Sequence, residues 1–251
     1  MKKIEDVSTF SKLAEGADFF LSESFYYIEK SMIDELSSII FAQKLDSIEP
    51  TKSDRELEKK ITITSNTVEL LQNDVDIPLT EETLNLISEA WQQAQIEAGM
   101  LVDQKHNFQH KHVINSINLI GHFNNFGFFI ETLVNRHLLF LKLTNEINSF
   151  CYARISESRI MERIIYIFKN DLNNNKIHIN EIVNLFSLRN KTVHYTPKNA
   201  IALNSKLSEI LQIWNQSLKL ISIIEIKENI IDSNFTENLK NHINSFKEKW
   251  I

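Results

Sequence analysis

Apolar side chains recur every three or four residues in the first part of the chain, which is the spacing of one face of an α-helix. The segment from Ala17 to Leu45 keeps this spacing with little to break it, and it predicts one long helix. After a break at residues 76–78, Thr80 and the two glutamates behind it predict a helix start, because an N-cap hydroxyl and first-turn carboxylates complement free backbone N–H groups. This second helix is predicted to end near Val102.

The second half of the chain has the same helical spacing, interrupted by polar loops. An Asn-rich loop at residues 171–175 separates two of its apolar segments. Thr196 as N-cap and Pro197 as first helical residue predict another helix start. The predicted helices are residues 113 to about 148, 157–168, 180–188, 197 to about 230, and a short helix that ends at 251.

The most apolar stretch, residues 117–143, is interrupted by polar and charged side chains. A membrane span needs about 20 nearly uninterrupted apolar residues. The stretch therefore predicts a buried helix, and no membrane contact is expected. Gly121 and Gly127 each cost about 1 kcal/mol relative to alanine inside a helix, so they predict the close approach of another backbone.

Composition supports an all-α fold. The 251 residues include only four Gly and three Pro, few against average usage of roughly 7% and 5%. The single cysteine, Cys151, cannot form an internal disulfide, and no thiol pair has zinc or redox spacing. The charged start, residues 1–6, lacks the apolar core of a signal peptide. We therefore expect a cytoplasmic protein.

The charge is unevenly distributed, and this suggests two regions. Residues 1–112 hold 11 Lys and Arg against 21 Asp and Glu, a net charge of −10, whereas residues 113–251 hold 16 against 12, a net charge of +4. The polar stretch 103–112 is the predicted boundary between an acidic helical region, 1–112, and a second domain, 113–251. The second domain is the one expected to meet an anion, although an ordinary solvated surface has the same balance.

The boundary stretch contains three histidines, His106, His110 and His112. Two histidines four residues apart can share a helix face, as some metal ligands do. Only Asp103 accompanies them as a further ligand type, and histidines cluster by chance in a polar linker. We therefore expect no metal and no cofactor.

One short motif, Arg189-Asn190-Lys191-Thr192-Val193-His194-Tyr195, combines the side chains that phosphodiester chemistry needs. Arg189 offers a planar fork of donors that matches phosphate oxygens. His194 can act as base or acid near neutral pH. Asn190 lies one helical turn before His194 and can orient its imidazole. These three residues are the predicted catalytic residues, with Lys191 and Tyr195 in support.

Two further groups of residues are candidates for supporting roles. Glu131, on the apolar helix, needs a partner if it is buried; it either braces Arg189 or His194 or serves only the fold. Arg159, Arg163 and Lys198 extend the basic surface and are the candidate RNA-binding residues. For Arg159 and Arg163 the alternative is ion pairing with Glu162 or with the acidic N-terminal half.

The order of these features over residues 113–251 resembles the HEPN family: a long helix with an internal Glu and Asn, a shorter helix, an Asn-rich loop, and then Arg, four residues and His. Family members commonly have Asn, Asp or His directly after the Arg, and Asn190 takes that place here. Many toxin members have Tyr two residues after the His, where this chain has Thr196 and places Tyr195 next to the His. The resemblance implies a four-helix bundle that dimerises around a composite groove.

The activity that this resemblance implies is metal-independent cleavage of RNA, in toxins, phage defence or RNA processing. We therefore expect an endoribonuclease acting on tRNA or another structured RNA, as a toxin or an antiviral, abortive-infection effector. The alternative is a non-catalytic module that binds RNA, a nucleotide or a partner protein. A homodimer is expected, with an antitoxin or defence-system protein as a possible partner, and residues 1–112 would sense, restrain or dock.

Overall fold

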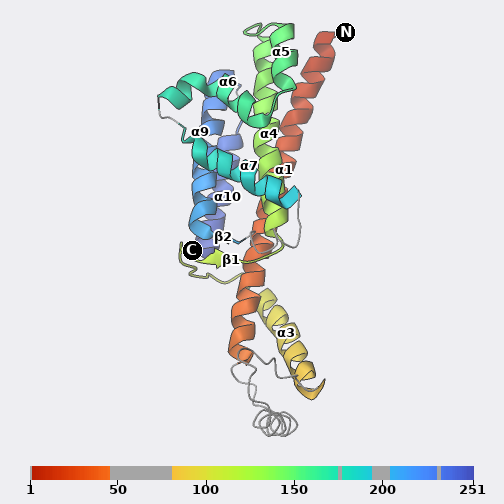
Figure 1. Cartoon of the computed structure of the whole chain (residues 1–251), viewed down its shortest axis with the longest axis vertical. Coiled ribbons are helices and arrows are strands. Elements are labelled where there is room, and N and C mark those ends of the chain that lie inside the picture. Colours follow the sequence, from red (N-terminus) through yellow and green to blue (C-terminus); the bar gives the residue numbers. More distant parts are fainter. Residues whose placement is uncertain (1, 46–80, 175–176, 194–203, 231–232) are drawn as a thin grey trace, which may run out of the picture. The chain divides into compact units, whose positions relative to one another are not determined.

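The computed structural model describes residues 2–45, 81–174, 177–193, 204–230 and 233–251. Within these ranges it has eight helices and one short two-stranded sheet (Figure 1), which confirms the all-α prediction. The elements are α1 (Lys2–Leu45), α3 (Glu81–Leu101), β1 (Val113–Ile114), α4 (Leu119–Leu143), α5 (Ser149–Ser156), α6 (Ile160–Asn173), α7 (Ile179–Val193), β2 (Ser205–Lys206), α9 (Leu207–Glu228) and α10 (Phe235–Trp250).

The chain forms two compact units. One comprises residues 1–32 together with 104–251, and the other comprises residues 33–103. This division differs from the boundary expected at residue 112, because the first part of α1 packs with the C-terminal part of the chain. The charge pattern carried no sign of this packing, since the buried face of a helix is apolar whichever partner it meets.

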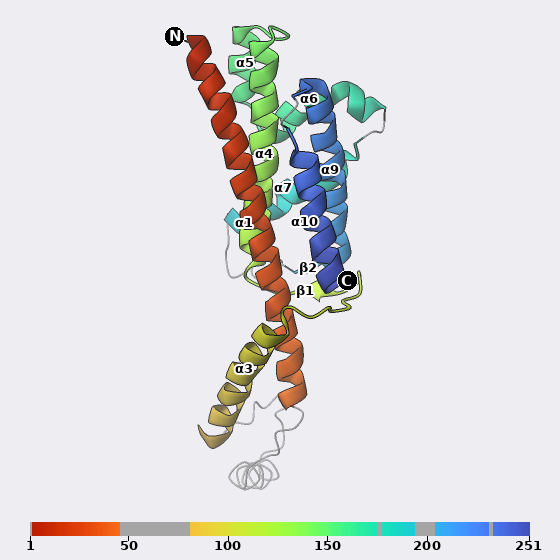
Figure 2. The ribbon, with the colours of Figure 1, turned by 180° about the vertical axis from the view of Figure 1, so that it is seen from behind.

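The larger unit is built around α4. The first part of α1, α4, α9 and α10 run side by side, whereas α6 and α7 lie across them on one face (Figures 1 and 2). Trp214 of α9 is fully buried at the centre, with its ring 4.9 Å from Phe25 of α1 and 5.1 Å from Phe246 of α10. Aromatic side chains thus hold α1 against α9 and α10, which are remote from it in sequence.

The helix predicted over residues 113–148 is wrong at both ends. Residues 113–114 pair as an antiparallel strand with residues 205–206, and α4 begins only at Leu119. α4 ends at Leu143, and a separate helix, α5, follows, with the Asn148 side chain accepting a hydrogen bond from the backbone N–H of Cys151 at 2.8 Å. A strand of two residues is too short to leave an alternating apolar and polar pattern in the sequence.

The helix predicted from Pro197 to about residue 230 is interrupted, because residues 205–206 form a strand. α9 begins at Leu207, directly after β2, and Thr196 and Pro197 lie outside the described residues. The helix predicted over residues 157–168 is observed as α6, which begins at Ile160 and continues to Asn173, into the loop predicted at residues 171–175. At the other end of the chain, α1 begins at Lys2 rather than near Ala17.

At two glycines of α4 the space left by the missing Cβ is filled by a side chain, and not by the backbone of another segment as predicted. A Cβ built on Gly121 would overlap the ring of Tyr27, and one built on Gly127 would lie 2.6 Å from Cδ of Arg189. Real Cβ atoms do not approach so closely. The absence of a side chain at these positions therefore makes room for one tyrosine ring and one arginine stem.

The smaller unit pairs the end of α1 with α3. Its core contains Leu36 and Ile40 of α1 with Ala94 and Ala98 of α3. Alanines four residues apart share a helix face and let the two helices pack closely. At the edge, Lys44 pairs with Glu97 at 2.9 Å.

The histidine-containing stretch before β1 lies along the end of α10. The backbone N–H of His106 donates to the carbonyl of Lys249 at 2.7 Å, and the His106 ring stacks on Trp250 with centroids 4.9 Å apart. His112 packs against Phe108. These contacts give two of the three histidines a packing role. No helix in the described part of the chain combines the length and the apolar character that a membrane span needs.

Candidate functional site

Arg189 lies near the end of α7, on the side that faces α4. The apolar positions of α7 recur at helical spacing, and Ile182, Leu185, Phe186 and Leu188 are buried. This buried stripe fixes which way α7 is rotated. Arg189 follows at the rim of the stripe, and its side chain keeps an exposed fraction of 17%.

The guanidinium of Arg189 is bound to Glu131. Nη1 of Arg189 donates to Oε2 of Glu131 at 3.0 Å, and the Glu131 side chain is 25% exposed. An arginine was one of the partners that the apolar setting of Glu131 called for. Nε of Arg189 is enclosed and has no hydrogen-bond partner among the described residues, so Glu131 uses only part of the donor fork.

Arg163 of α6 reaches the other oxygen of the same carboxylate. Its Nη1 lies 3.6 Å from Oε1 of Glu131 and donates to Oδ1 of Asn135 at 2.6 Å, while its Nε donates to the carbonyl of Ser158 at 2.9 Å. Two arginines thus share one carboxylate, and the group of three carries a net charge of +1. We call Glu131, Asn135, Arg163 and Arg189 the arginine cluster.

The stem of Arg189 is fixed from two sides. Its guanidinium carbon lies 4.3 Å from the ring centroid of Phe128, a cation–π contact, and Gly127 leaves the space that Cδ occupies. Phe186 lies on α7 itself, 6.0 Å away. Arg189 is therefore positioned by an anion, an aromatic ring and a glycine, all of them on α4.

The last turn of α7 is attached to α4 by a second contact. The hydroxyl of buried Thr192 lies 2.7 Å from Oδ1 of Asn124 and 2.6 Å from the carbonyl oxygen of Arg189. A hydroxyl has one hydrogen to donate, so it serves one of these acceptors at a time. The contact orders the helix end that immediately precedes His194 in the sequence.

The remaining predicted site residues lie outside this cluster. Asn190 and Lys191 are exposed on the last turn of α7. Arg159 is exposed directly before α6, and its backbone N–H donates to Oε2 of Glu162 at 3.4 Å. Arg163 has Glu131 as its partner, rather than the Glu162 or the acidic half that the alternative named. The three predicted residues His194, Tyr195 and Lys198 lie outside the described residues.

Sequence reasoning missed two members of the site, Asn124 and Phe128, although a signal was present. Asn124, Phe128, Glu131 and Asn135 follow one another at three- and four-residue spacing on α4, and Gly127 is adjacent to Phe128. Such spacing places them on one stripe of the helix. A polar stripe on an otherwise apolar helix marks a face that meets polar partners, and the partners here are α6 and α7.

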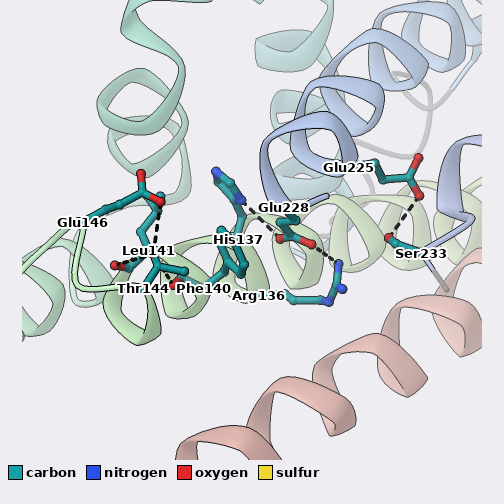
Figure 3. A network of polar contacts seen from close by, with 9 residues as sticks. All are labelled: Arg136, His137, Phe140, Leu141, Thr144, Glu146, Glu225, Glu228 and Ser233. Atoms are coloured by element: carbon teal, nitrogen blue, oxygen red, sulfur yellow. Dashed lines mark hydrogen bonds and ion pairs between the residues drawn. The ribbon is translucent and has the colours of Figure 1, made fainter. Parts of the chain in front are cut away.

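A second polar group, shown in Figure 3, is buried on the opposite side of α4. Nη1 of Arg136 lies 2.6 Å from Oε2 of Glu228, and Nδ1 of His137 lies 3.2 Å from Oε1 of the same carboxylate. Phe10 and Phe235 rings contact the guanidinium at 4.3 and 5.2 Å. These side chains are almost completely buried, so they bind the end of α9 to α4 and offer no access to a substrate.

Electrostatics in the larger unit follows burial. Desolvation lowers the pKa of Arg136, and the nearby Glu228 carboxylate opposes that change. Desolvation also lowers the pKa of His122 to about 4, although its Nδ1 lies 3.1 Å from the carbonyl oxygen of Ser24. His122 is therefore neutral at physiological pH, and its ring serves as a buried packing group.

Within the described ranges, no group of three or more His, Cys, Asp or Glu side chains is arranged to hold a metal ion. No family model matches the chain, and searches of the curated proteins and of the solved structures return no match either. The arginine cluster is the candidate functional site of the described residues.

Proposed function

We propose that this protein is an endoribonuclease that cleaves RNA without a metal ion, with Arg189 and His194 as its catalytic residues. The observation that carries the proposal is the positioning of Arg189. A side chain that only covers the surface needs no fixed place, whereas Arg189 is held by Glu131, Phe128 and the space at Gly127. The proposal includes the HEPN-like four-helix bundle that the motif implies.

The chemistry follows from the residue types. A base removes the proton of the 2′-hydroxyl, and the resulting oxygen attacks the adjacent phosphorus. The P–O5′ bond breaks, leaving a 2′,3′-cyclic phosphate, and an acid gives a proton to the departing 5′-oxygen. Histidine can serve as base or acid near neutral pH. The guanidinium of Arg189 stabilises the charge that develops on the phosphorane oxygens.

The proposed active form is a homodimer. Arg189 and His194 are five residues apart, which corresponds to about 140° around an ideal helix. One copy of the motif would therefore aim the two side chains in different directions. Two copies facing each other would bring Arg189 of one subunit to the phosphate served by His194 of the other. An antitoxin or defence-system protein, and a cytoplasmic location, belong to the same proposal.

The second candidate function is a non-catalytic module that binds RNA, a nucleotide or a partner protein. The observation that favours it is the low exposure of Arg189, 17%, together with its ion pair to Glu131. A partly buried pair of this kind can serve the fold alone. In that case Arg189 would hold α7 against α4 and would contact no substrate.

The two candidates are separated by incubating the purified full chain with total RNA in EDTA and reading the products on a gel. The proposal predicts fragments from the wild type and none from the Arg189→Lys or His194→Ala variants, because lysine keeps the charge but lacks the planar fork. The matched control is Arg154→Ala, which removes an exposed arginine on α5. RNA that is shifted but intact supports the binding module, and fragments from both variants refute the mechanism.

The composite site has its own test. Inactive Arg189→Ala and inactive His194→Ala chains are mixed under conditions that allow subunit exchange. A mixed dimer would contain one site with both catalytic side chains intact, so cleavage is expected to return to up to about half of the wild-type rate per such dimer. A mixture that stays inactive, although it forms mixed dimers, contradicts the arrangement across two subunits.

A further inference from the structure

The solvent face of α6 carries a tyrosine beside basic side chains. α6 buries Ile164, Phe168 and Asp171 against the rest of the larger unit. Tyr166 is on the other side of the helix and is 50% exposed. Arg163 lies three residues before it, which makes the two side chains neighbours on the helix surface. Arg159, the N-cap of α6, and Lys169, directly after a kink at Phe168, flank the pair in sequence and are exposed.

No contact among the described residues explains why Tyr166 stands at the surface. Among the described residues its ring makes no aromatic contact and its hydroxyl makes no hydrogen bond. Half of the tyrosine side chain therefore faces water, close in sequence to the positively charged Arg159, Arg163 and Lys169. Aromatic rings beside arginines are typical of protein surfaces that bind single-stranded nucleic acids, because a base stacks on the ring while the cations bind the phosphates.

The tyrosine is connected to the arginine cluster by Arg163. That arginine contacts Glu131 and Asn135 of α4, and Glu131 contacts Arg189. Along the axis of α6, Arg163 and Tyr166 are separated by about 4.5 Å. This is comparable with the rise of about 3.4 Å per nucleotide in a stacked strand. A strand with a phosphate at Arg163 would therefore have a neighbouring base within reach of Tyr166.

We infer that the solvent face of α6 binds an unpaired RNA strand next to the arginine cluster, with one base stacked on Tyr166 and phosphates held by Arg159, Arg163 and Lys169. The inference rests on the proposed function and narrows its substrate to RNA that is single-stranded at the site. In a double helix each base is stacked on its neighbours and its face is not available to a side chain. Charge complementarity is provided by Arg159, Lys169 and the net charge of +1 on the arginine cluster, against one carboxylate, Glu162, at the start of α6.

The test measures binding rather than cleavage. The full chain is titrated into a short 2′-O-methyl oligoadenylate that carries one 2-aminopurine, in EDTA. This probe has no free 2′-hydroxyl and cannot be cut by the proposed reaction, and its fluorescence is quenched when the base stacks. Tyr166→Ala is expected to weaken binding about tenfold and to abolish the added quenching. Tyr166→Phe should bind within about twofold of the wild type, since phenylalanine keeps the stacking face.

The matched control is Ile165→Ala, because Ile165 is the preceding residue and is also 50% exposed. It should leave binding unchanged, and the same strand annealed to its complement should bind equally to wild type and Tyr166→Ala. Binding that is as strong in Tyr166→Ala as in the wild type overturns this inference and leaves the proposed function standing. A wild-type chain that binds neither form of RNA also overturns this inference, whereas the proposed function fails only if total RNA stays intact in EDTA. Circular dichroism checks that each variant is folded.

Discussion

Replacing Gly127 with alanine is expected to disturb Arg189 selectively. The new Cβ would lie 2.6 Å from Cδ of Arg189 and 3.4 Å from its Cγ and Nε. Cδ is in the middle of the side chain, and the guanidinium beyond it is held by Glu131 and Phe128. The arginine therefore has to leave its position, and the contacts with Glu131 and Phe128 are weakened.

The size of the effect on stability follows from two opposing contributions. Alanine in place of glycine inside a helix contributes about 1 kcal/mol of stabilisation. Overpacking costs about 1–3 kcal/mol. The net expectation is a destabilisation of about 0–2 kcal/mol. When Arg189 is first replaced with alanine, the clashing atom is gone and only the helix contribution remains. Gly127→Ala should then stabilise the protein by about 0.5–1 kcal/mol.

The assay is a double-mutant cycle of denaturant unfolding, followed by tryptophan fluorescence. The coupling free energy between Gly127→Ala and Arg189→Ala is expected to be about 1–3 kcal/mol. Gly16→Ala serves as the control in the same unit, because its Cβ would meet only Cγ2 of Thr132, at 3.9 Å. It should stabilise the protein in either background. Equal effects of Gly127→Ala with and without Arg189 would refute the reasoning.

Two further predictions concern buried charge. Burial lowers the pKa of His122 from 6.5 to about 4, so the unfolded chain binds a proton at this histidine before the folded chain does as the pH falls. The contribution of neutral His122 to stability is complete above pH 6.5 and decreases by up to about 3 kcal/mol toward pH 4. Denaturant unfolding at each pH should show that this decrease is absent in His122→Gln. Glu228→Gln should cost about 3–5 kcal/mol, because it removes the carboxylate that directly contacts the buried Arg136. Glu237→Gln, at an exposed ion pair, should change the unfolding free energy by less than about 1 kcal/mol; similar losses in the two glutamate variants would contradict the argument.

The helices could be predicted because each buries an apolar stripe, and the stripe is written in the sequence. The need of Glu131 for a partner could also be predicted, since a carboxylate on an apolar helix is costly to bury alone. The choice between Arg189 and His194 as that partner could not. It depends on how α7 is rotated against α4, and that rotation results from the packing of Phe186 and its neighbours rather than from local spacing.

Other features were hidden because they depend on contacts between remote residues. Glu228 meets Arg136 across 92 positions of sequence, and each of them reads as an ordinary surface charge in isolation. The pairing of β1 with β2 involves two residues on each side. Gly127 could be recognised as unusual in a helix, but whether a backbone or a side chain fills its space is decided by the tertiary fold.

The central claim is that the motif beginning at Arg189 cleaves RNA by activating the 2′-hydroxyl of the RNA to attack the adjacent phosphorus. The most direct measurement is the chemical identity of the new 3′ ends after incubation of RNA with the full chain in EDTA. We predict 2′,3′-cyclic phosphate ends with the wild type and with Arg154→Ala, and no new ends with His194→Ala or Arg189→Lys. Intact RNA with the wild type, or the same cyclic ends with both motif variants, would contradict the claim.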